Sequence, residues 1–335
     1  MGNRSFGEPR MSQPLTPPRT IAKAVLDRSF RVLVLQGGWS SEREVSLASG
    51  KGVQTALTKL GHEVEALDPP RHVRAILDGI EQSFGGRGPE IIFNILHGLE
   101  VEDGTLQGVL TLVGIPYTFS GVSASVVAMH KGLSRLLMQE VGVMCPPGRT
   151  LSLDDYAACD WPYPHVVKPL GEGSSVGVFL VEKAQDKQNV VSSWSFGPQV
   201  LVEDYIPGRE IQVAVFAGQA MGAVELCFPG PIFDYEAKYT AGMTQHIIPP
   251  DVPTEVLEVM YAWAERAHHT LGCRGITRTD FRYNPEAAVG YQVFFLETNT
   301  QPGFTDISLV PDIARVYGWS YEEVITFLLD QALRA

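Results

Sequence analysis

An apolar run near the C-terminus ends in two side chains with oxygen donors, Glu297 and Asn299, two positions apart. Alternate residues of a β-strand point to the same face, so this carboxylate and this amide oxygen would stand side by side. Asp280 lies on a segment that could pair beside this strand, and Arg278 adds a cation two residues earlier. Hard oxygen donors without a nearby Cys or His suit Mg²⁺ or Mn²⁺ and not zinc. The pattern therefore predicts a metal site that handles anions, with a nucleotide phosphate as the obvious candidate.

A glycine-rich segment, residues 171–177, follows an apolar strand that ends in Lys168. Because another strand comes next, the segment is neither a Walker A loop nor a dinucleotide fingerprint. It could close over phosphates as the glycine-rich hairpin of kinases does, and an ordinary flexible hairpin is an equal alternative. A lysine that ends a buried strand needs a partner, and phosphate suits it. Lys131 has a weaker case, because lysines on helices are usually solvated.

The polar candidates of the N-terminal part follow apolar strands. Ser41 and Glu44 have the spacing of a capping box, which gives Glu44 a structural role. Glu42 has no such local role and could hold a substrate ammonium group, although an exposed acid in a first helical turn is the plainer alternative. His97 follows the third strand and could contact substrate, or it could be a structural histidine.

Two segments of the C-terminal half could act on bound substrate. The loop 233–239 contains two tyrosines and a lysine, which fit a lid that excludes water during transfer, and a surface loop with an aromatic cluster is the alternative. Ser308 precedes a short helix, so it could cap that helix or bind a carboxylate together with nearby backbone amides.

The composition is that of an acidic globular enzyme. Its 335 residues can form two or three domains, and 26 Lys and Arg against 38 Asp and Glu give a net charge of −12. This charge argues against nucleic acid or an anionic membrane as the main partner. The four cysteines show neither C-x-x-C pairing nor metal spacing, which indicates free thiols in a reducing cytoplasm. No apolar segment is long enough to span a bilayer.

An alternation of strands and helices must position these candidates. Strands at 31–36, 63–67 and 91–96, with helices at 43–60 and 105–113, predict a parallel α/β layer. Ligands in such layers bind beyond the carboxyl ends of the strands, here 37–42 and 97–103. A single helix is expected over 123–141. The remaining expected strands lie at 165–168, 176–181, 200–204, 211–217 and 220–225 and around 280 and 297, with helices at 254–271 and 321–334.

These elements divide the chain into four parts. Residues 1–30 lack the apolar core of a signal peptide and are expected to form a flexible tail. Residues 31–122 are expected to form an N-terminal α/β substrate domain, and 123–210 a central domain. Residues 211–335 are expected to form a C-terminal domain with the metal site and the lid loop.

Nine motifs appear in the order typical of D-alanine–D-alanine ligases, of the ATP-grasp superfamily, and the chain resembles this family from about residue 31 to residue 329. One such motif would be weak evidence, whereas nine in order are very specific. The motifs read GGWSSEREVSL, LHGLEVEDGTLQG, PYTFSGVSASVVAM-x-K, VVKPLGEGSSVGV, VLVEDYIPGREIQVAV, FDYEAKY, GCRGITRTDF, FLETNTQPGFT and SLVP.

The resemblance implies an ATP-grasp fold of three domains, with an N-terminal parallel α/β layer, an α+β nucleotide-binding part, and ATP held between the second and third domains. The γ-phosphoryl group would pass to the carboxylate of one D-alanine. The amine of a second D-alanine would then attack the acylphosphate and give the dipeptide used in peptidoglycan precursors. It also implies a cytoplasmic homodimer, with no nucleic-acid partner and no membrane insertion.

The resemblance assigns ligands to ATP and to two Mg²⁺ or Mn²⁺ ions. The ions would be held by Asp280, Glu297 and Asn299. The nucleotide would be held by Lys131, Lys168, Glu172, Gly173, Ser174, Ser175, Glu203, Glu210 and, from the lid, Lys238. Glu203 and Glu210 match positions near adenine and ribose.

The resemblance also assigns residues to the first D-alanine. Glu42 would hold its ammonium group, with His97 beside it. Glu42, Ser174 and Tyr239 would form a hydrogen-bonded set that links the site to the lid. Tyr239 matters most for specificity, because relatives that make the D-lactate ester differ there, and its presence favours the dipeptide.

The second half of the reaction is assigned to residues of the last motifs. Arg278 and the amide of Gly303 would stabilise the tetrahedral oxyanion as the second amine attacks. Ser308 and Leu309 would receive the carboxylate of the second D-alanine.

The chain departs from the family pattern at three places. His130 stands where Asp is common before the helix lysine, Val101 stands where Gly is common, and Thr-Asp-Ile before Ser308 is more acidic than usual. These departures bear on kinetics and second-site selectivity, because none removes a residue assigned to chemistry.

Three alternatives to this reading remain. One is a related ligase that makes D-Ala-D-Ser, D-Ala-D-Lac or another amide. A second is a non-catalytic nucleotide-binding homologue, which the presence of every metal ligand and of Arg278 disfavours. A nicotinamide dehydrogenase is disfavoured by the absence of a G-x-G-x-x-G turn after the first strand.

Overall fold

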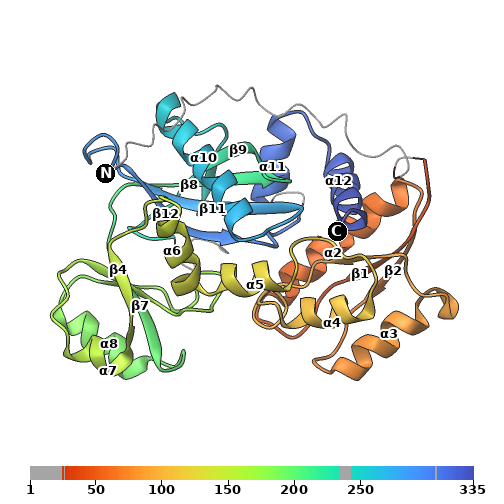
Figure 1. Cartoon of the computed structure of the whole chain (residues 1–335), viewed down its shortest axis with the longest axis horizontal. Helices are drawn as coiled ribbons and strands as arrows, with labels where there is room; N and C mark the ends of the chain where they lie inside the picture. The colour runs from red at the N-terminus through yellow and green to blue at the C-terminus, as the bar shows by residue number, and fades with distance from the viewer. Residues whose placement is uncertain (1–24, 26, 234–242, 306–307) are drawn as a thin grey trace.

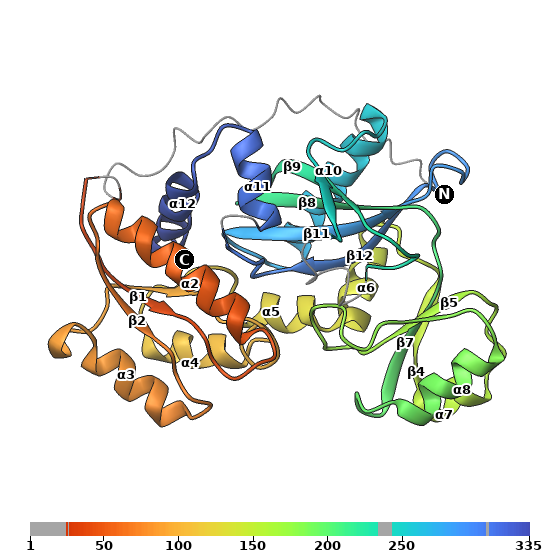
Figure 2. The same ribbon diagram turned by 180° about the vertical axis from the view of Figure 1, so that it is seen from behind.

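Three sheets organise the chain in the computed structural model, which describes residue 25 and residues 27–233, 243–305 and 308–335 (Figures 1 and 2). Their strand orders are β2-β1-β3, β4-β7-β5-β6 and β10-β9-β8-β11-β12. No helix in these ranges is long and apolar enough to cross a membrane.

The first sheet is the predicted parallel layer. Its strands are β1 (Arg31–Leu35), β2 (Glu63–Leu67) and β3 (Ile91–Asn94), and β1 pairs in parallel with both neighbours. Its helices are α2 (Arg43–Lys59), α3 (Val73–Gly86) and α4 (Thr105–Val113). Strand β3 is buried on both faces, as expected of a parallel sheet covered by helices. The loops that leave the carboxyl ends of β1 and β3 carry Glu42 and His97.

The predicted capping box at Ser41 and Glu44 is wrong. Helix α2 starts at Arg43, so its N-cap is Glu42, and no side chain makes a capping bond there. A capping box needs its serine at the N-cap, and Ser41 lies one residue too early. The side chain of Glu42 bonds instead to a distant residue, Ser174.

The single helix predicted over 123–141 is also wrong, because it is broken at His130 into α5 (Val122–Met129) and α6 (Lys131–Glu140). His130 has φ −81° and ψ 91°, outside the helical region. Its amide donates to Val126 O at 3.2 Å and closes α5, and its Nδ1 accepts from Leu133 N at 3.2 Å and starts α6. The residue at the break is neither glycine nor proline. The break places Lys131 in the first turn of α6, where it is buried.

The second sheet is antiparallel and consists of β4 (Gly148–Ser152), β5 (His165–Lys168), β6 (Phe179–Val181) and β7 (Gln199–Asp204). Helices α7 (Leu153–Ala158) and α8 (Ala184–Ser193) accompany it. Strand β6 is shorter than the predicted 176–181. Val176 and Val178 donate instead to the carbonyls of Gly173 and Ser175, so the preceding residues form turns.

The third sheet is antiparallel and carries β8 (Arg209–Phe216), β9 (Gln219–Cys227), β10 (Gln245–Ile247), β11 (Ile276–Tyr283) and β12 (Val293–Asn299). Helix α10 (Thr254–Thr270) packs on one face together with residues of α5 and α6. Helices α11 (Leu309–Val316) and α12 (Tyr321–Leu333) join the other face to the N-terminal layer in one continuous core (Figure 1).

The cap at His130 generates a stability prediction. His130→Ala should lower the free energy of unfolding by about 1 kcal/mol, because Leu133 N loses its acceptor. His130→Asp should retain stability, since a carboxylate can accept the same bond. Urea denaturation of the three proteins measures the difference, and equal stability of the Ala and Asp variants would contradict the capping role.

Buried His268 on α10 predicts a pH dependence of stability. Its Nδ1 lies 2.9 Å from Thr277 Oγ1, and burial, with a smaller effect of His269, lowers the pKa of His268 from 6.5 to about 4. Between these values the unfolded chain takes up a proton that the folded protein does not. Stability should therefore fall as the pH decreases from 6.5 to 4, by about 3 kcal/mol from this group. Urea titrations of the wild type and His268→Gln across this window should differ in slope, and parallel curves would contradict the prediction.

Candidate functional site

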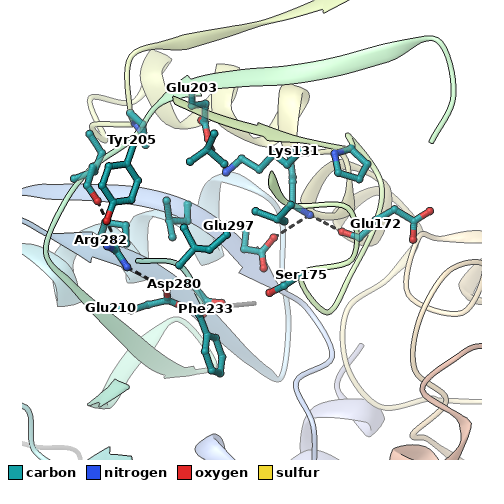
Figure 3. Close-up of a pocket in the computed structure, with 18 of the residues that line it drawn as sticks. Lys131, Glu172, Ser175, Glu203, Tyr205, Glu210, Phe233, Asp280, Arg282 and Glu297 are labelled. Carbon is teal, nitrogen blue, oxygen red and sulfur yellow. Dashed lines mark hydrogen bonds and ion pairs between the residues drawn. The ribbon is translucent and has the colours of Figure 1, made fainter. Parts of the chain in front are cut away.

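A cleft of about 930 Å³ lies between the second and third sheets (Figure 3). Side chains from β5, β7, β8, β11, β12, α6 and the glycine-rich segment face it. Its charged lining residues are Lys131, Lys168, Glu172, Glu203, Asp204, Glu210, Arg278, Asp280, Arg282 and Glu297. Eight of these were assigned as ligands of nucleotide, metal or substrate by the family resemblance, and the fold brings all eight into one cleft.

Lys131 lies where the elements around the cleft meet. Its Nζ is 3.0 Å from Glu297 Oε2 on β12 and donates to the carbonyl of Glu172 at 2.6 Å (Figure 3). The expectation that a helix lysine is solvated does not hold here, because the break at His130 turns this residue inward. The ammonium group is thus shared by the third sheet and the glycine-rich segment.

Glu203 on β7 is buried between two cations. Its carboxylate lies 2.5 Å from Lys168 Nζ and 2.6 Å from Arg135 Nη1. Arg135 also donates to the carbonyls of Pro146 and Gly148. Sequence reasoning missed Arg135, although its spacing of four residues from Lys131 places both on one helical face. Lys168 therefore has a protein partner, so its burial does not by itself require phosphate.

Asp280 and Glu297 are direct cross-strand neighbours on β11 and β12, as the sequence predicted. Arg278 donates to both oxygens of Asp280, at 2.8 and 2.9 Å, and lies opposite Asn299. Nearby Glu210 is fully buried. Burial, and next the charge of Asp280, raise the pKa of Glu210 to about 7. A cation bound nearby would lower the repulsion between the carboxylates of Glu210 and Asp280.

The donor side chains suit a Mg²⁺ or Mn²⁺ ion that the protein coordinates only in part, and not a metal ion held entirely by protein ligands. Within the described ranges, no group of three or more His, Cys, Asp and Glu side chains is placed to hold a metal ion. Asp280, Glu297 and Asn299 supply two carboxylates and one amide. Mg²⁺ usually keeps several waters and takes one or two carboxylates together with substrate phosphates. The donor set is therefore suited to a metal that arrives with a phosphate ligand.

A second cleft of about 1990 Å³ opens into the first. Both are lined by Lys131, Glu172, Phe233, Arg278 and Glu297. The second cleft alone is lined by the remaining predicted substrate and metal residues Glu42, His97, Asn299, Gly303, Ser308 and Leu309. The two clefts thus meet at the lysine, the arginine and the carboxylate that the sequence placed at the reaction centre.

Glu42 and Ser174 connect the N-terminal layer to the glycine-rich segment. Ser174 Oγ donates to Glu42 Oε1 across 132 positions of sequence. Ser174 and Ser175 have φ of 51° and 59°, a left-handed conformation that non-glycine residues rarely adopt. Such strain persists where surrounding contacts enforce it, commonly at functional sites.

His97 is held by Glu102, a residue to which the sequence assigned no role. The Nδ1 of His97 lies 3.0 Å from Glu102 Oε1, and both residues are buried. Burial is the main cause that raises the pKa of Glu102 above its ordinary value. His97 Nε2 is buried without a hydrogen-bond partner among the described residues. Glu102 therefore fixes the orientation of the imidazole ring, and His97 lines the second cleft.

Ser308 occupies the N-cap position of α11, but its side chain makes no capping bond. Its Oγ accepts from Thr305 N at 2.9 Å and lies 2.8 Å from Thr305 Oγ1. The first amides of α11, beginning at Leu309, belong to the donors that a helix leaves unpaired. A carboxylate-binding role for Ser308 and Leu309 remains a prediction that this geometry permits.

Lys238 and Tyr239 lie outside the described residues, as do Asp306 and Ile307. The lid hypothesis and the part of Tyr239 in the set with Glu42 and Ser174 therefore stay predictions.

Comparison with known proteins shows extensive similarity. Residues 153–330 match the family model "D-ala D-ala ligase C-terminus". The chain is 43% identical over 314 residues to a D-alanine–D-alanine ligase of Erythrobacter litoralis. The aligned region covers 92% of this chain and 95% of the relative.

The chain is also similar to solved structures of ligases. Two structures of the D-alanine–D-alanine ligase from Bacillus anthracis superpose with a TM-score of 0.76 over 91% of this chain and 98% of theirs. Their identities are 28% and, for the complex with ATP, 24%. The VanG D-Ala:D-Ser ligase from Enterococcus faecalis gives a TM-score of 0.75 at 25% identity, over 91% of this chain and 100% of its own.

The buried cluster around Glu203 predicts a large effect on stability. Glu203→Gln should lower the free energy of unfolding by about 3 kcal/mol or more, because Arg135 and Lys168 lose their shared counter-charge in a buried site. The neighbouring Asp204→Asn is the control, since Asp204 accepts from Trp161 Nε1 with an oxygen that Asn retains. Urea unfolding compares the two, and a loss below 1 kcal/mol for Glu203→Gln would contradict the prediction.

Proposed function

The chain belongs to the D-alanine–D-alanine ligase family, and from this premise we propose that it joins two D-alanine molecules at the expense of ATP. The products are D-alanyl-D-alanine, ADP and phosphate, and the reaction passes through an acylphosphate. The dipeptide would serve the synthesis of peptidoglycan precursors.

One observation carries the proposal: the two clefts share Lys131, Arg278 and Glu297. A ligase of this kind must bring a phosphoryl donor and a carboxylate acceptor to one point. The first cleft has the lysines and the glycine-rich segment that suit a triphosphate. The second has an acid, Glu42, that suits an ammonium group. The shared residues are those that can neutralise charge where the two would meet.

Nucleotide binding is proposed for the first cleft. Lys131 and Lys168 would hold phosphates, and the amides and hydroxyls of residues 172–175 would close over them. Glu203 would accept a hydrogen bond from the exocyclic amine of adenine. Glu210 would lie toward the ribose.

Two divalent ions, Mg²⁺ or Mn²⁺, are proposed to be bound by Asp280, Glu297 and Asn299 together with phosphate oxygens. When bound, the ions would neutralise the charge of the transferring phosphoryl group.

In the first step, Glu42 would hold the ammonium group of one D-alanine, with His97 beside it. An oxygen of the substrate carboxylate attacks the γ-phosphorus, the bond from that phosphorus to the β,γ-bridging oxygen breaks, and ADP leaves. Lys131 lies where the two anions approach, so its charge lowers their repulsion.

In the second step, the neutral amine of another D-alanine attacks the acyl carbon. The new C–N bond forms, the bond to the phosphate oxygen breaks, and the amine loses a proton. Arg278 keeps donors on Nη1 beyond those that bind Asp280, and these can stabilise the oxyanion with the amide of Gly303. Ser308 and Leu309 would position the second carboxylate.

The setting of the reaction is part of the proposal. We place it in the cytoplasm, where ATP is available, and expect a homodimer on the basis of family membership. Light scattering of the purified protein measures the latter.

The reaction itself is tested by phosphate release from ATP with Mg²⁺ and D-alanine, with products identified by mass spectrometry. Release matched by D-alanyl-D-alanine is expected. L-alanine should give none, and D-alanine with D-serine or D-lactate should still give mainly the dipeptide. A mixed product in excess would move the assignment to a D-Ala-D-X ligase, and no release with any pairing would refute ligase activity.

The shared carboxylate is tested by Glu297→Gln, which keeps the shape of the side chain and removes its charge. Loss of a charged group that acts in the transition state should lower the rate by about 100-fold or more. Glu225→Gln is the matched control, because Glu225 is a buried acid of the same sheet, paired with Arg209 at 2.5 Å, and lines neither cleft. Equal rates for the two variants would contradict the role of Glu297.

A further inference from the structure

A pair of buried side-chain amides joins the N-terminal layer to the loop that follows β12. Asn94 is the last residue of β3, and Gln301 lies two residues beyond the end of β12. Asn94 Nδ2 donates to Gln301 Oε1 at 2.8 Å, across 207 positions of sequence. Their exposed fractions are 0% and 1%. No role in the proposed chemistry has been given to either residue so far.

The contact is part of a closed ring of three hydrogen bonds. Asn94 Oδ1 accepts from Leu96 N at 3.3 Å, and Gln301 Nε2 donates to Leu96 O. The backbone N–H and C=O of Leu96 are therefore both hydrogen-bonded, and Leu96 directly precedes His97. The ring thus fixes the backbone at the point where the N-terminal layer enters the second cleft.

Gln301 connects the ring to the end of β12, which carries Asn299, and to the loop after it, which carries Gly303. The backbone amide of Gln301 donates to Asn299 Oδ1 at 3.0 Å, and Gly303 lies two residues further on. Next to it, Phe304 packs edge to face against Phe93, with ring centroids 6.2 Å apart. The apolar contact between Phe304 and Phe93 has no fixed direction, whereas hydrogen bonds are directional. The amides of Asn94 and Gln301 therefore fix where the loop lies relative to β3.

We propose that Asn94 and Gln301 are positioning residues of the ligation reaction. Their ring sets the distance between the part of the site that holds the first amino acid, around His97, and the loop that supplies Asn299 and the Gly303 amide. The inference rests on the proposed function. Its physical basis is that a displacement of about 1 Å between reacting groups can cost about 100-fold in rate.

The test separates positioning from simple stability. Gln301→Leu and Asn94→Leu each leave one buried amide without its partner, which lowers stability. The double variant removes both side-chain amides and leaves only the N–H and C=O of Leu96 without their partners, so it should lose less stability than the two single variants added together. The ties to Leu96 are absent in the double variant. If the ring positions the site, kcat stays at least as low there as in the single variants, although the urea midpoint lies above the value that additivity predicts.

The control is Gln54→Leu. Gln54 Nε2 donates to Gln36 Oε1 at 2.7 Å and to Gly50 O at 3.1 Å, which is a partly buried amide pair inside the N-terminal layer, away from both clefts. Rates are measured as D-alanine-dependent ADP release with dipeptide detection, and ATP affinity as a separate binding constant. We expect kcat to fall at least tenfold in the single and double variants, ATP affinity to stay within threefold, and Gln54→Leu to retain its rate within twofold.

Two results would overturn the inference. One is recovery of kcat together with stability in the double variant, which would reduce the ring to a structural contact. The other is an equal rate loss in Gln54→Leu. If a single variant does not fold, the double variant still decides. Absence of dipeptide from the wild type would instead refute the proposed function, and this inference with it, before any variant is compared.

Discussion

The clefts depend on the pairing of buried opposite charges that come from different elements. Lys131 of α6 meets Glu297 of β12, and Glu203 of β7 lies between Lys168 and Arg135. Removing such charges from water is costly, and loss of one partner leaves the other uncompensated. A chain with a net charge of −12 can in this way keep cations concentrated in one place. An anion that enters can take a lysine from its carboxylate, which frees that carboxylate for a metal.

An exchange of this kind would account for a lining that is both acidic and basic. Phosphate is bound by cations and a metal ion by carboxylates, so a site proposed to bind both would have these groups paired with each other before the ligands bind. Glu210 shows the limit of this arrangement. Its distant pairing with Arg282, 3.7 Å apart, does not offset burial and the nearby Asp280, and its pKa rises to about 7. Lys131 and Glu297 are thus closely paired, whereas Glu210 has no ion-pair partner as close among the described residues.

Several local sequence patterns predicted the secondary structure correctly. Strands β2 and β5 and helix α4 have the predicted bounds, and Glu297 and Asn299 share a face because they alternate along β12. Two of the misses involve contacts between distant segments. After the break at His130, Lys131 N donates to Leu170 O, and Asn94 bonds to Gln301 across 207 positions of sequence. Periodicity within one segment contains no information about a partner in another.

Two of the three departures from the family pattern fall on positions that the fold can accommodate. At His130, where the family commonly has Asp, the imidazole Nδ1 accepts the same kind of helix-capping bond that a carboxylate would. At Val101, where Gly is common, the side chain is 1% exposed and packs with Leu106 and Leu110 in the core of the N-terminal layer. Positive φ values in that loop are taken by Gly98, Glu100 and Gly104, and not by Val101. Both substitutions thus keep a local structural function by another chemical means, and this is why they can coexist with an unaltered set of residues at the meeting point of the two clefts.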